Sequence, residues 1–126
     1  MQIDLNRMLL IANQQIKKLS FSESLKYISK DNSFIIDVRE ESELKVNGRI
    51  KNSIHIPRGV IEFSLNPDIE DNPYNIKKDS TLLLYCAGGY RSALAAKTLQ
   101  DIGYKNVFNI GGFGEWIDNG GPIQKK

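Results

Sequence analysis

Cysteine and histidine each occur only once in this chain of 126 residues. The single cysteine, Cys86, excludes an internal disulfide and any metal site built on several thiolates. Because His55 is the only histidine, a zinc site would need carboxylates for most of its ligands, so we expect neither a metal nor an organic cofactor. The lack of a disulfide framework is typical of a reducing compartment, and we predict a cytoplasmic location.

Long apolar runs and blocks of one charge are missing as well. No stretch approaches the roughly 20 apolar residues that a helix needs to span a bilayer. The apolar run at residues 8–12 is too short for a secretory signal, and Asp4 stands where such a signal carries positive charge. The net charge is only +2, and the lysine pairs are far apart in the sequence. We therefore expect neither a membrane nor a nucleic acid as partner.

What remains is the composition of one globular domain, with 40% hydrophobic and 25% charged residues. Apolar residues recur at helical spacing over residues 4–16, with Asp4 as a predicted N-cap. We divide the chain into an N-terminal helical extension, residues 1–18, and a domain, residues 19–126. We expect the extension to pack on the domain, with a dimer or partner surface as the alternative.

Strands alternate with helices along the rest of the chain. Short apolar runs predict strands at residues 34–36, 54–56, 81–85 and 107–110. Helices are predicted from residue 22, with Leu25 and Ile28 facing inward, after the Cys86 segment as far as Gly103, and at residues 113–118. Residues 64–79 are predicted to form a surface loop and residues 111–112 a turn.

This alternation predicts an α/β domain with a mainly parallel central sheet flanked by helices on both faces. Ligands of such sheets bind at the carboxyl ends of the strands, where loops lead into helices. The segment that begins with Cys86 occupies this position.

Residues 86–92 read Cys-Ala-Gly-Gly-Tyr-Arg-Ser, a pattern that favours an anion. The start of a helix offers unpaired N–H groups, and Gly88 and Gly89 allow several of them to converge on one sulfur. Arg91 adds a positive charge. Together these features are expected to lower the pKa of Cys86 and to yield the thiolate, which is the nucleophilic form.

Two other interpretations of this loop stay open. A cysteine at the end of a core strand is often an inert buried residue. A glycine-rich turn before a helix is also how proteins bind phosphate groups, so the spacing alone indicates an anion site without naming the anion.

Four segments, in order, give the chain a resemblance to the rhodanese family over about residues 19–122. One is the Cys86 loop itself. The others are Ile36-Asp37-Val38-Arg39 with Glu40 and Glu43, residues 48–50 leading to residues 54–59, and residues 103–107 followed by Gly111-Gly112 and Trp116.

The resemblance implies a sulfurtransferase that moves a sulfane sulfur from thiosulfate or a persulfide to cyanide, a thiol or a protein. Cys86 would carry the sulfur as a persulfide. The loop residues implied to bind substrate are Ala87, Gly88, Gly89, Tyr90, Arg91 and Ser92. By the same resemblance Asp37 and Arg39 are structural, and Arg58 lines the mouth of the pocket.

The chain departs from the family pattern at two places. Arg49 stands where the family often has a structural histidine, which we expect to affect only a surface turn. Ala87 and Gly88 are small and uncharged, whereas some thiosulfate-using relatives carry basic side chains there. This second departure favours a persulfide or thiol donor over thiosulfate.

Three rival functions stay open. A sulfur carrier without turnover and a protein-binding module would keep the same fold. A cysteine-dependent phosphatase or arsenate reductase has a related anion site, but such phosphatases place five residues between cysteine and arginine, whereas four lie between Cys86 and Arg91.

Overall fold

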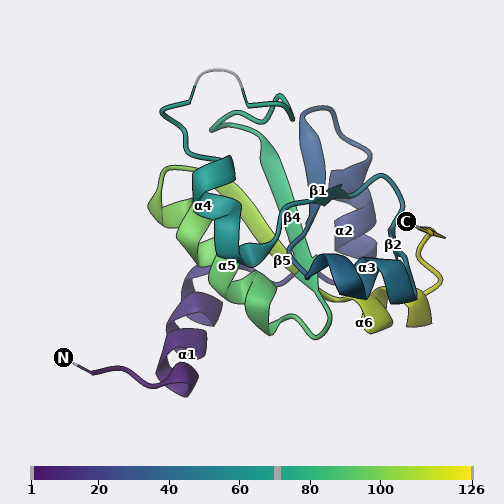
Figure 1. Cartoon of the computed structure of the whole chain (residues 1–126), viewed down its shortest axis with the longest axis horizontal. Coiled ribbons are helices and arrows are strands. Elements are labelled where there is room, and N and C mark those ends of the chain that lie inside the picture. Colours follow the sequence, from purple (N-terminus) through teal and green to yellow (C-terminus); the bar gives the residue numbers. More distant parts are fainter. Residues whose placement is uncertain (1, 70–71, 126) are drawn as a thin grey trace.

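A four-stranded sheet lies at the centre of the structure, a computed structural model that describes residues 2–69 and 72–125 (Figure 1). The strands stand in the order β3-β1-β4-β5 and are all parallel to their neighbours. Their bounds are Ser33–Asp37 for β1, Ile54–His55 for β3, Thr81–Cys86 for β4 and Asn106–Gly112 for β5. A separate antiparallel pair joins β2, Arg49–Ile50, to β6, Ile123–Gln124.

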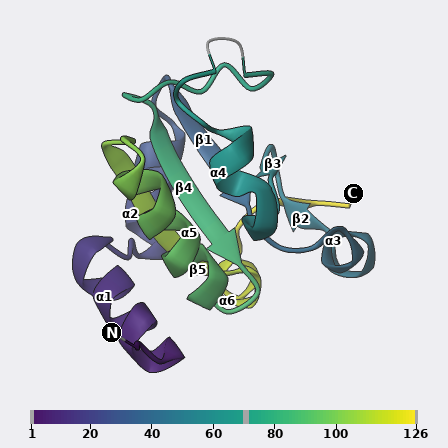
Figure 2. The ribbon, with the colours of Figure 1, turned by 60° about the vertical axis from the view of Figure 1, so that its left-hand side comes forward.

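Helices cover both faces of the central sheet (Figures 1 and 2). Their bounds are Leu5–Gln15 for α1, Phe21–Ile28 for α2, Glu41–Asn47 for α3, Ile61–Ser64 for α4, Tyr90–Asp101 for α5 and Phe113–Asp118 for α6, with a 3-10 turn, η1, at Arg58–Val60. One core cluster joins the sheet to α4 and α5, and the other joins it to α2 and α6. The predicted α/β class, with a mainly parallel sheet between helices, is confirmed.

The alternation of side chains in β4 decides which face receives the cysteine. Leu82, Leu84 and Cys86 point into the core beneath α4 and α5. Leu83 and Tyr85 point into the opposite core beneath α2 and α6. Both faces of this central strand are buried, as is typical of a parallel sheet.

The N-terminal helix α1 lies against α5 (Figure 2). The Asp4 carboxylate accepts a bond of 2.8 Å from the backbone N–H of Arg7, which confirms the predicted N-cap. Ala12 and Ile16 are buried against the domain, whereas Leu5 remains 60% exposed. Within the described ranges, no helix has the length and apolar character needed to cross a membrane.

The second helix differs from the prediction at its start and on its buried face. It begins at Phe21 rather than at Ser22, because Ser20 and Glu23 form a capping box that satisfies two backbone N–H groups. Leu25, predicted to face inward, is 41% exposed. The buried position is instead Ser24, whose hydroxyl donates to the Ser20 carbonyl and so needs no solvent.

The predicted turn at residues 111–112 is wrong, because β5 continues through both glycines. The pairing register shifts opposite Leu84 and Tyr85, and Gly111 takes a positive φ of 93° there. Helix α3, the η1–α4 segment and the β2–β6 pair were not predicted. They are short, and their sequences lack a long apolar periodicity.

Candidate active site

Strand β4 places Cys86 at the carboxyl edge of the sheet, directly before the loop that leads into α5. The cysteine is buried, with 1% of its surface exposed, whereas Ala87, Gly88 and Tyr90 are exposed around it. The sulfur therefore lies at the base of an exposed loop.

The Cys86 sulfur accepts hydrogen bonds from the start of α5. The backbone N–H of Gly89 donates to Sγ at 3.0 Å and that of Ser92 at 3.4 Å, and the Ser92 hydroxyl lies 3.4 Å from Sγ. Burial on its own would raise the pKa of the Cys86 thiol. The hydrogen bonds from Ser92, Gly89 and Gly88 outweigh this effect, so the pKa of Cys86 lies below its ordinary value.

Glycines shape the loop at two points. Gly89 has a φ of +94°, a conformation that other residues rarely adopt, and this turn directs its N–H toward the sulfur. Gly112, in the neighbouring strand β5, lies so close to the loop that an added Cβ would stand 2.4 Å from the Ala87 carbonyl oxygen. The loop therefore fits against β5 only because Gly112 has no side chain.

Asn109 supports the loop from behind and was not among the predicted site residues. It is buried in β5, and its Oδ1 accepts bonds from the Ser92 hydroxyl at 2.8 Å and from the Gly111 N–H at 2.9 Å. Its amide donates to the Gly89 carbonyl at 3.0 Å. Asn109 thus fixes Ser92 and Gly89, two of the residues whose N–H groups are directed at the sulfur. A polar residue in an otherwise apolar strand was the available signal.

Arg91 is paired with a carboxylate and does not act as an isolated charge. Its guanidinium donates to both oxygens of Glu43, in α3, at 2.8 and 2.9 Å. The bond from Arg91 lowers the pKa of the Glu43 carboxyl to about 2. The bond to Glu43 in turn raises the pKa of Arg91 above its ordinary value, and the nearby Cys86 sulfur adds to this rise. The pair leaves little net charge beside the sulfur.

The rhodanese-like domain family matches residues 20–119 of this sequence. The chain belongs to this family. A protein of Schizosaccharomyces pombe named "Putative thiosulfate sulfurtransferase, mitochondrial" is 36% identical over 97 residues, which cover 73% of this chain and 66% of that protein. The match begins at residue 20, so the N-terminal helix α1 lies outside it.

Two solved structures are similar over nearly the whole rhodanese-like chain. A Rhodopseudomonas palustris protein, described as of unknown function and as "Possible Tyrosine Phosphatase", has a TM-score of 0.82 and 39% identity, covering 98% of this chain and 96% of that one. The polysulfide-sulfur transferase homodimer of Wolinella succinogenes has a TM-score of 0.74 and 30% identity, covering 94% of this chain and 85% of that one. The matched members of the family thus include proteins named as sulfurtransferases.

Asp37 and Arg39 of this rhodanese-like domain form a buried ion pair behind the active-site edge. Arg39 Nη2 lies 2.7 Å from Asp37 Oδ2, and the two residues are 1% and 0% exposed. The Tyr85 hydroxyl donates to the same carboxylate, and Arg39 also donates to the Gly48 carbonyl. Burial and the neighbouring Asp37 charge raise the pKa of Tyr85, which keeps it protonated as a donor. These contacts join β1, β4 and the end of α3.

A cavity of about 310 Å³ opens beside the Cys86 loop at Ala87. Helix α6 contributes Phe113 and Ile117 to its lining, and α3 contributes Glu43. The exposed ring of Tyr90 is not part of this lining. The lining combines apolar and polar side chains, so an organic substrate group would pack on the apolar part that α6 supplies. The apolar lining residues are Ala87, Phe113 and Ile117, and the polar ones are Arg39, Glu43 and Asn47.

Arg58 lies elsewhere. It follows β3 and borders a different cavity, between α1 and α5, rather than the one at Ala87. His55 Nε2 lies 2.7 Å from the Arg39 carbonyl oxygen, so this nitrogen is engaged away from the sulfur. Across the described residues, no group of three or more His, Cys, Asp or Glu side chains is placed to hold a metal ion.

Proposed function

We propose that this rhodanese-like domain is a sulfurtransferase that carries a sulfane sulfur as a persulfide on Cys86. The observation that carries the proposal is the set of N–H groups, from Gly89 and Ser92, directed at the Cys86 sulfur. They favour an anion there and lower the pKa of the thiol, which supplies the attacking thiolate.

The reaction has two displacement steps. In the first, the Cys86 thiolate attacks the outer sulfur of the donor, a new S–S bond forms, and the donor leaves with the electron pair of the broken bond, as a thiolate or as sulfite. In the second, an acceptor thiolate or cyanide attacks the outer sulfur of the Cys86 persulfide. The acceptor takes that sulfur and the Cys86 thiolate is regenerated, so no external oxidant or reductant is needed.

The surroundings of the loop favour a persulfide donor over thiosulfate. Thiosulfate carries two negative charges, whereas the guanidinium groups of Arg91 and of Arg39, which lines the cavity, are already paired with Glu43 and Asp37. The cavity at Ala87 is bordered by apolar side chains of α6, which suit the organic part of a persulfide. Ala87 and Gly88 add no charge of their own.

The test is intact-protein mass after incubation with thiosulfate and, separately, with a low-molecular-weight persulfide. The expected result is a gain of one sulfur atom that a thiol or cyanide removes, with the persulfide as the faster donor. Cys86→Ser is the matched control, because it keeps the size of the side chain and removes the nucleophile. If neither donor adds sulfur to the folded wild type, the proposal is wrong.

A phosphatase is the second candidate, because the similar Rhodopseudomonas palustris protein is described as a possible tyrosine phosphatase. Two features argue against it in this chain. The loop has four residues between Cys86 and Arg91, one fewer than cysteine-dependent phosphatases place there, and the arginine is held by Glu43. Hydrolysis of p-nitrophenyl phosphate by the wild type, abolished in Cys86→Ser, would favour this candidate instead.

A further inference from the structure

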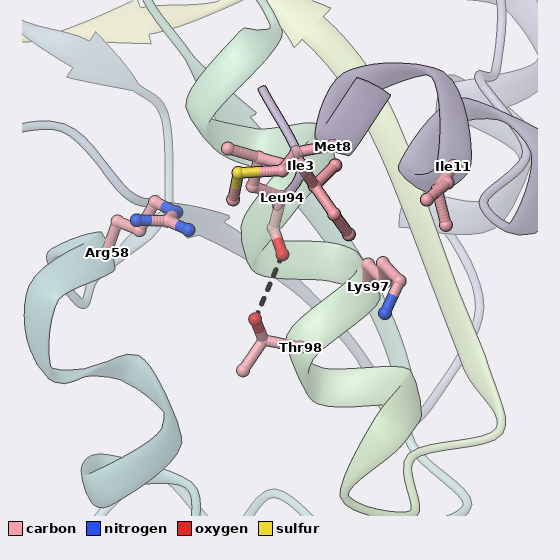
Figure 3. Close-up of a pocket in the computed structure, with 7 residues that line it drawn as sticks. All are labelled: Ile3, Met8, Ile11, Arg58, Leu94, Lys97 and Thr98. Carbon is pink, nitrogen blue, oxygen red and sulfur yellow. Dashed lines mark hydrogen bonds between the residues drawn. The ribbon is translucent and has the colours of Figure 1, made fainter. Parts of the chain in front are cut away.

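A second cavity, of about 230 Å³, lies between the N-terminal helix and α5 (Figure 3). Ile3, Met8 and Ile11 form its wall on the α1 side, and Leu94 forms its wall on α5. Arg58, from the turn after β3, closes one end. The cavity therefore joins the N-terminal helix to the domain that it covers.

Arg58 borders this cavity with a hydrogen-bond donor, its Nε–H group, that has no acceptor among the described residues. Its Nε is buried, and among the described residues none accepts a hydrogen bond from it. Figure 3 shows the guanidinium pointing toward the space between α1 and α5. A buried donor without an acceptor costs free energy, more so on a charged group, and a bound acceptor would remove that cost.

The position of Arg58 is fixed by the sheet. Its backbone N–H donates to the Val38 carbonyl at 3.1 Å, so the residue is tied to the end of β1. The guanidinium presents N–H groups in a planar fork, which matches the two oxygens of a carboxylate.

The other wall of the cavity is apolar and only half covered. Ile3 is 46% exposed and Met8 is 41% exposed, although both lie against the space above Leu94. Burying these side chains beneath a ligand would be favourable in proportion to the apolar area removed from water.

The charged side chains that border the cavity favour a ligand with one negative charge. Lys97 also borders the cavity, but its Nζ lies 2.6 Å from Asp101 and is neutralised by it. Arg58 therefore supplies the charge that a ligand can match. A carboxylate satisfies it, whereas a dianionic phosphate would keep a second charge in apolar surroundings.

We propose that this cavity binds a small amphipathic carboxylate, with its anionic group on Arg58 and its apolar tail between Met8 and Leu94. The volume of about 230 Å³ corresponds to roughly eight water-sized groups, which suits a short aliphatic acid. The site uses none of the residues that bond to the Cys86 sulfur, so it does not depend on sulfur transfer.

The experiment is a titration of the full chain with octanoate, followed by the NMR signals of the Arg58 Nε–H group and the Met8 methyl group. Both signals are expected to shift and to saturate together, with a dissociation constant in the millimolar range or below. Octanol, which has the same tail without the charge, is expected to bind roughly tenfold more weakly, as is acetate, which lacks the tail. The Cys86→Ser variant should give the same result, which separates this site from the proposed sulfur chemistry.

Three variants complete the test. Arg58→Met should weaken octanoate binding by roughly tenfold, whereas Arg7→Met, the same change at an exposed arginine of α1, should leave it unaltered. Met8→Trp should fill the cavity from the exposed side of α1 and block binding while Arg58 remains, which tests the site even if Arg58→Met does not fold. Shifts that do not saturate, equal affinity for octanol and octanoate, or equal losses in Arg58→Met and Arg7→Met would each overturn the proposal.

Discussion

The turns after β1 and β4 lie at the same edge of the sheet, and they stabilise negative charge in different ways. After β1, the Asp37 carboxylate is buried and matched by a full positive charge on Arg39. After β4, the Cys86 sulfur is matched by N–H dipoles from Gly89 and Ser92, and the nearest guanidinium is occupied by Glu43.

The ion pair at the β1 turn and the N–H dipoles at the β4 turn suit different roles. A buried ion pair fixes a structure, because removing one partner leaves an unmatched charge. A set of N–H dipoles tolerates a sulfur that alternates between thiol, thiolate and persulfide, because it commits no full charge to the site. The β1 turn is therefore the rigid support, and the β4 turn is the place where charge can change.

The largest effect on the free energy of unfolding is expected at the β1 turn. Arg39→Met removes the partner of Asp37 while keeping a long apolar side chain against Phe113. We expect a loss of about 3–5 kcal/mol in the free energy of unfolding, measured in urea. Arg7→Met, at an exposed position, should change this quantity by less than about 0.5 kcal/mol. A loss of under 1 kcal/mol from Arg39→Met would contradict a structural role for the pair.

A smaller loss of stability and a large loss of activity are expected from Gly112→Ala. The new Cβ would stand 2.4 Å from the Ala87 carbonyl oxygen and 3.1 Å from the Gly88 Cα, so the loop must move. We expect about 1–3 kcal/mol of destabilisation and a fall of roughly 10- to 100-fold in the rate of persulfide formation. Gly59→Ala is the control, because its Cβ would meet no atom within 4 Å and the residue does not line the cavity at Ala87. Equal rates in the two variants would show that the loop tolerates displacement.

Ser92→Ala is expected to raise the pKa of the Cys86 thiol. The Ser92 hydroxyl contributes to the lowered pKa of Cys86 and also holds the loop through its bond to Asn109, so its removal should raise that pKa. Thiolate absorbance as a function of pH measures the change. Thr98→Val, which removes another hydroxyl from α5, should leave the titration where it was.

The same lowered pKa makes stability depend on pH. Because Cys86 titrates at a lower pH in the folded protein than in the unfolded chain, the thiolate stabilises the fold fully above the ordinary value of 9.0. This contribution is lost as the pH falls through the native pKa. The difference in unfolding free energy between wild type and Cys86→Ala should therefore increase with pH across that window. A difference that stays constant would show that the pKa of Cys86 is not lowered.

The smallest effect on stability is expected from Glu43→Gln. The pair with Arg91 is partly exposed, so its loss should cost less than about 1 kcal/mol. Freed of its carboxylate, Arg91 should attract a dianionic donor, and the rate with thiosulfate relative to a persulfide should rise about threefold or more. Glu62→Gln removes a carboxylate from α4 instead and should leave the ratio unchanged. A ratio that does not rise in Glu43→Gln would remove the electrostatic argument for a persulfide donor.

Helices and strands formed by one continuous segment were predictable from the sequence. The strand before Cys86 and the closing helix at residues 113–118 were both predicted, because each is a continuous segment with its own apolar pattern. The position of Cys86 between a strand and a helix followed from the same local patterns. The prediction that it is the nucleophile stays a prediction until sulfur loading is measured.

Features made by distant residues were not predictable in this way. Glu43 and Arg91 are 48 positions apart, and Asn109 reaches Ser92 from the neighbouring strand. The pair Gly111 and Gly112 has the local signature of a turn, but the sheet uses it to let the Cys86 loop approach β5. In each case tertiary contacts decide the role, and single-sequence patterns do not contain them.

The parallel pairing of β4 with β5 also bears on when the surroundings of Cys86 are completed during folding. Two parallel strands cannot be joined by a tight turn, so this pair is closed by a crossover that contains the whole of α5. Before the pair closes, Asn109 does not hold Ser92 and Gly89, so the hydrogen bonds that lower the pKa of Cys86 are incomplete. The rate at which Cys86 reacts with an alkylating reagent during refolding therefore reports when the β4–β5 pair forms.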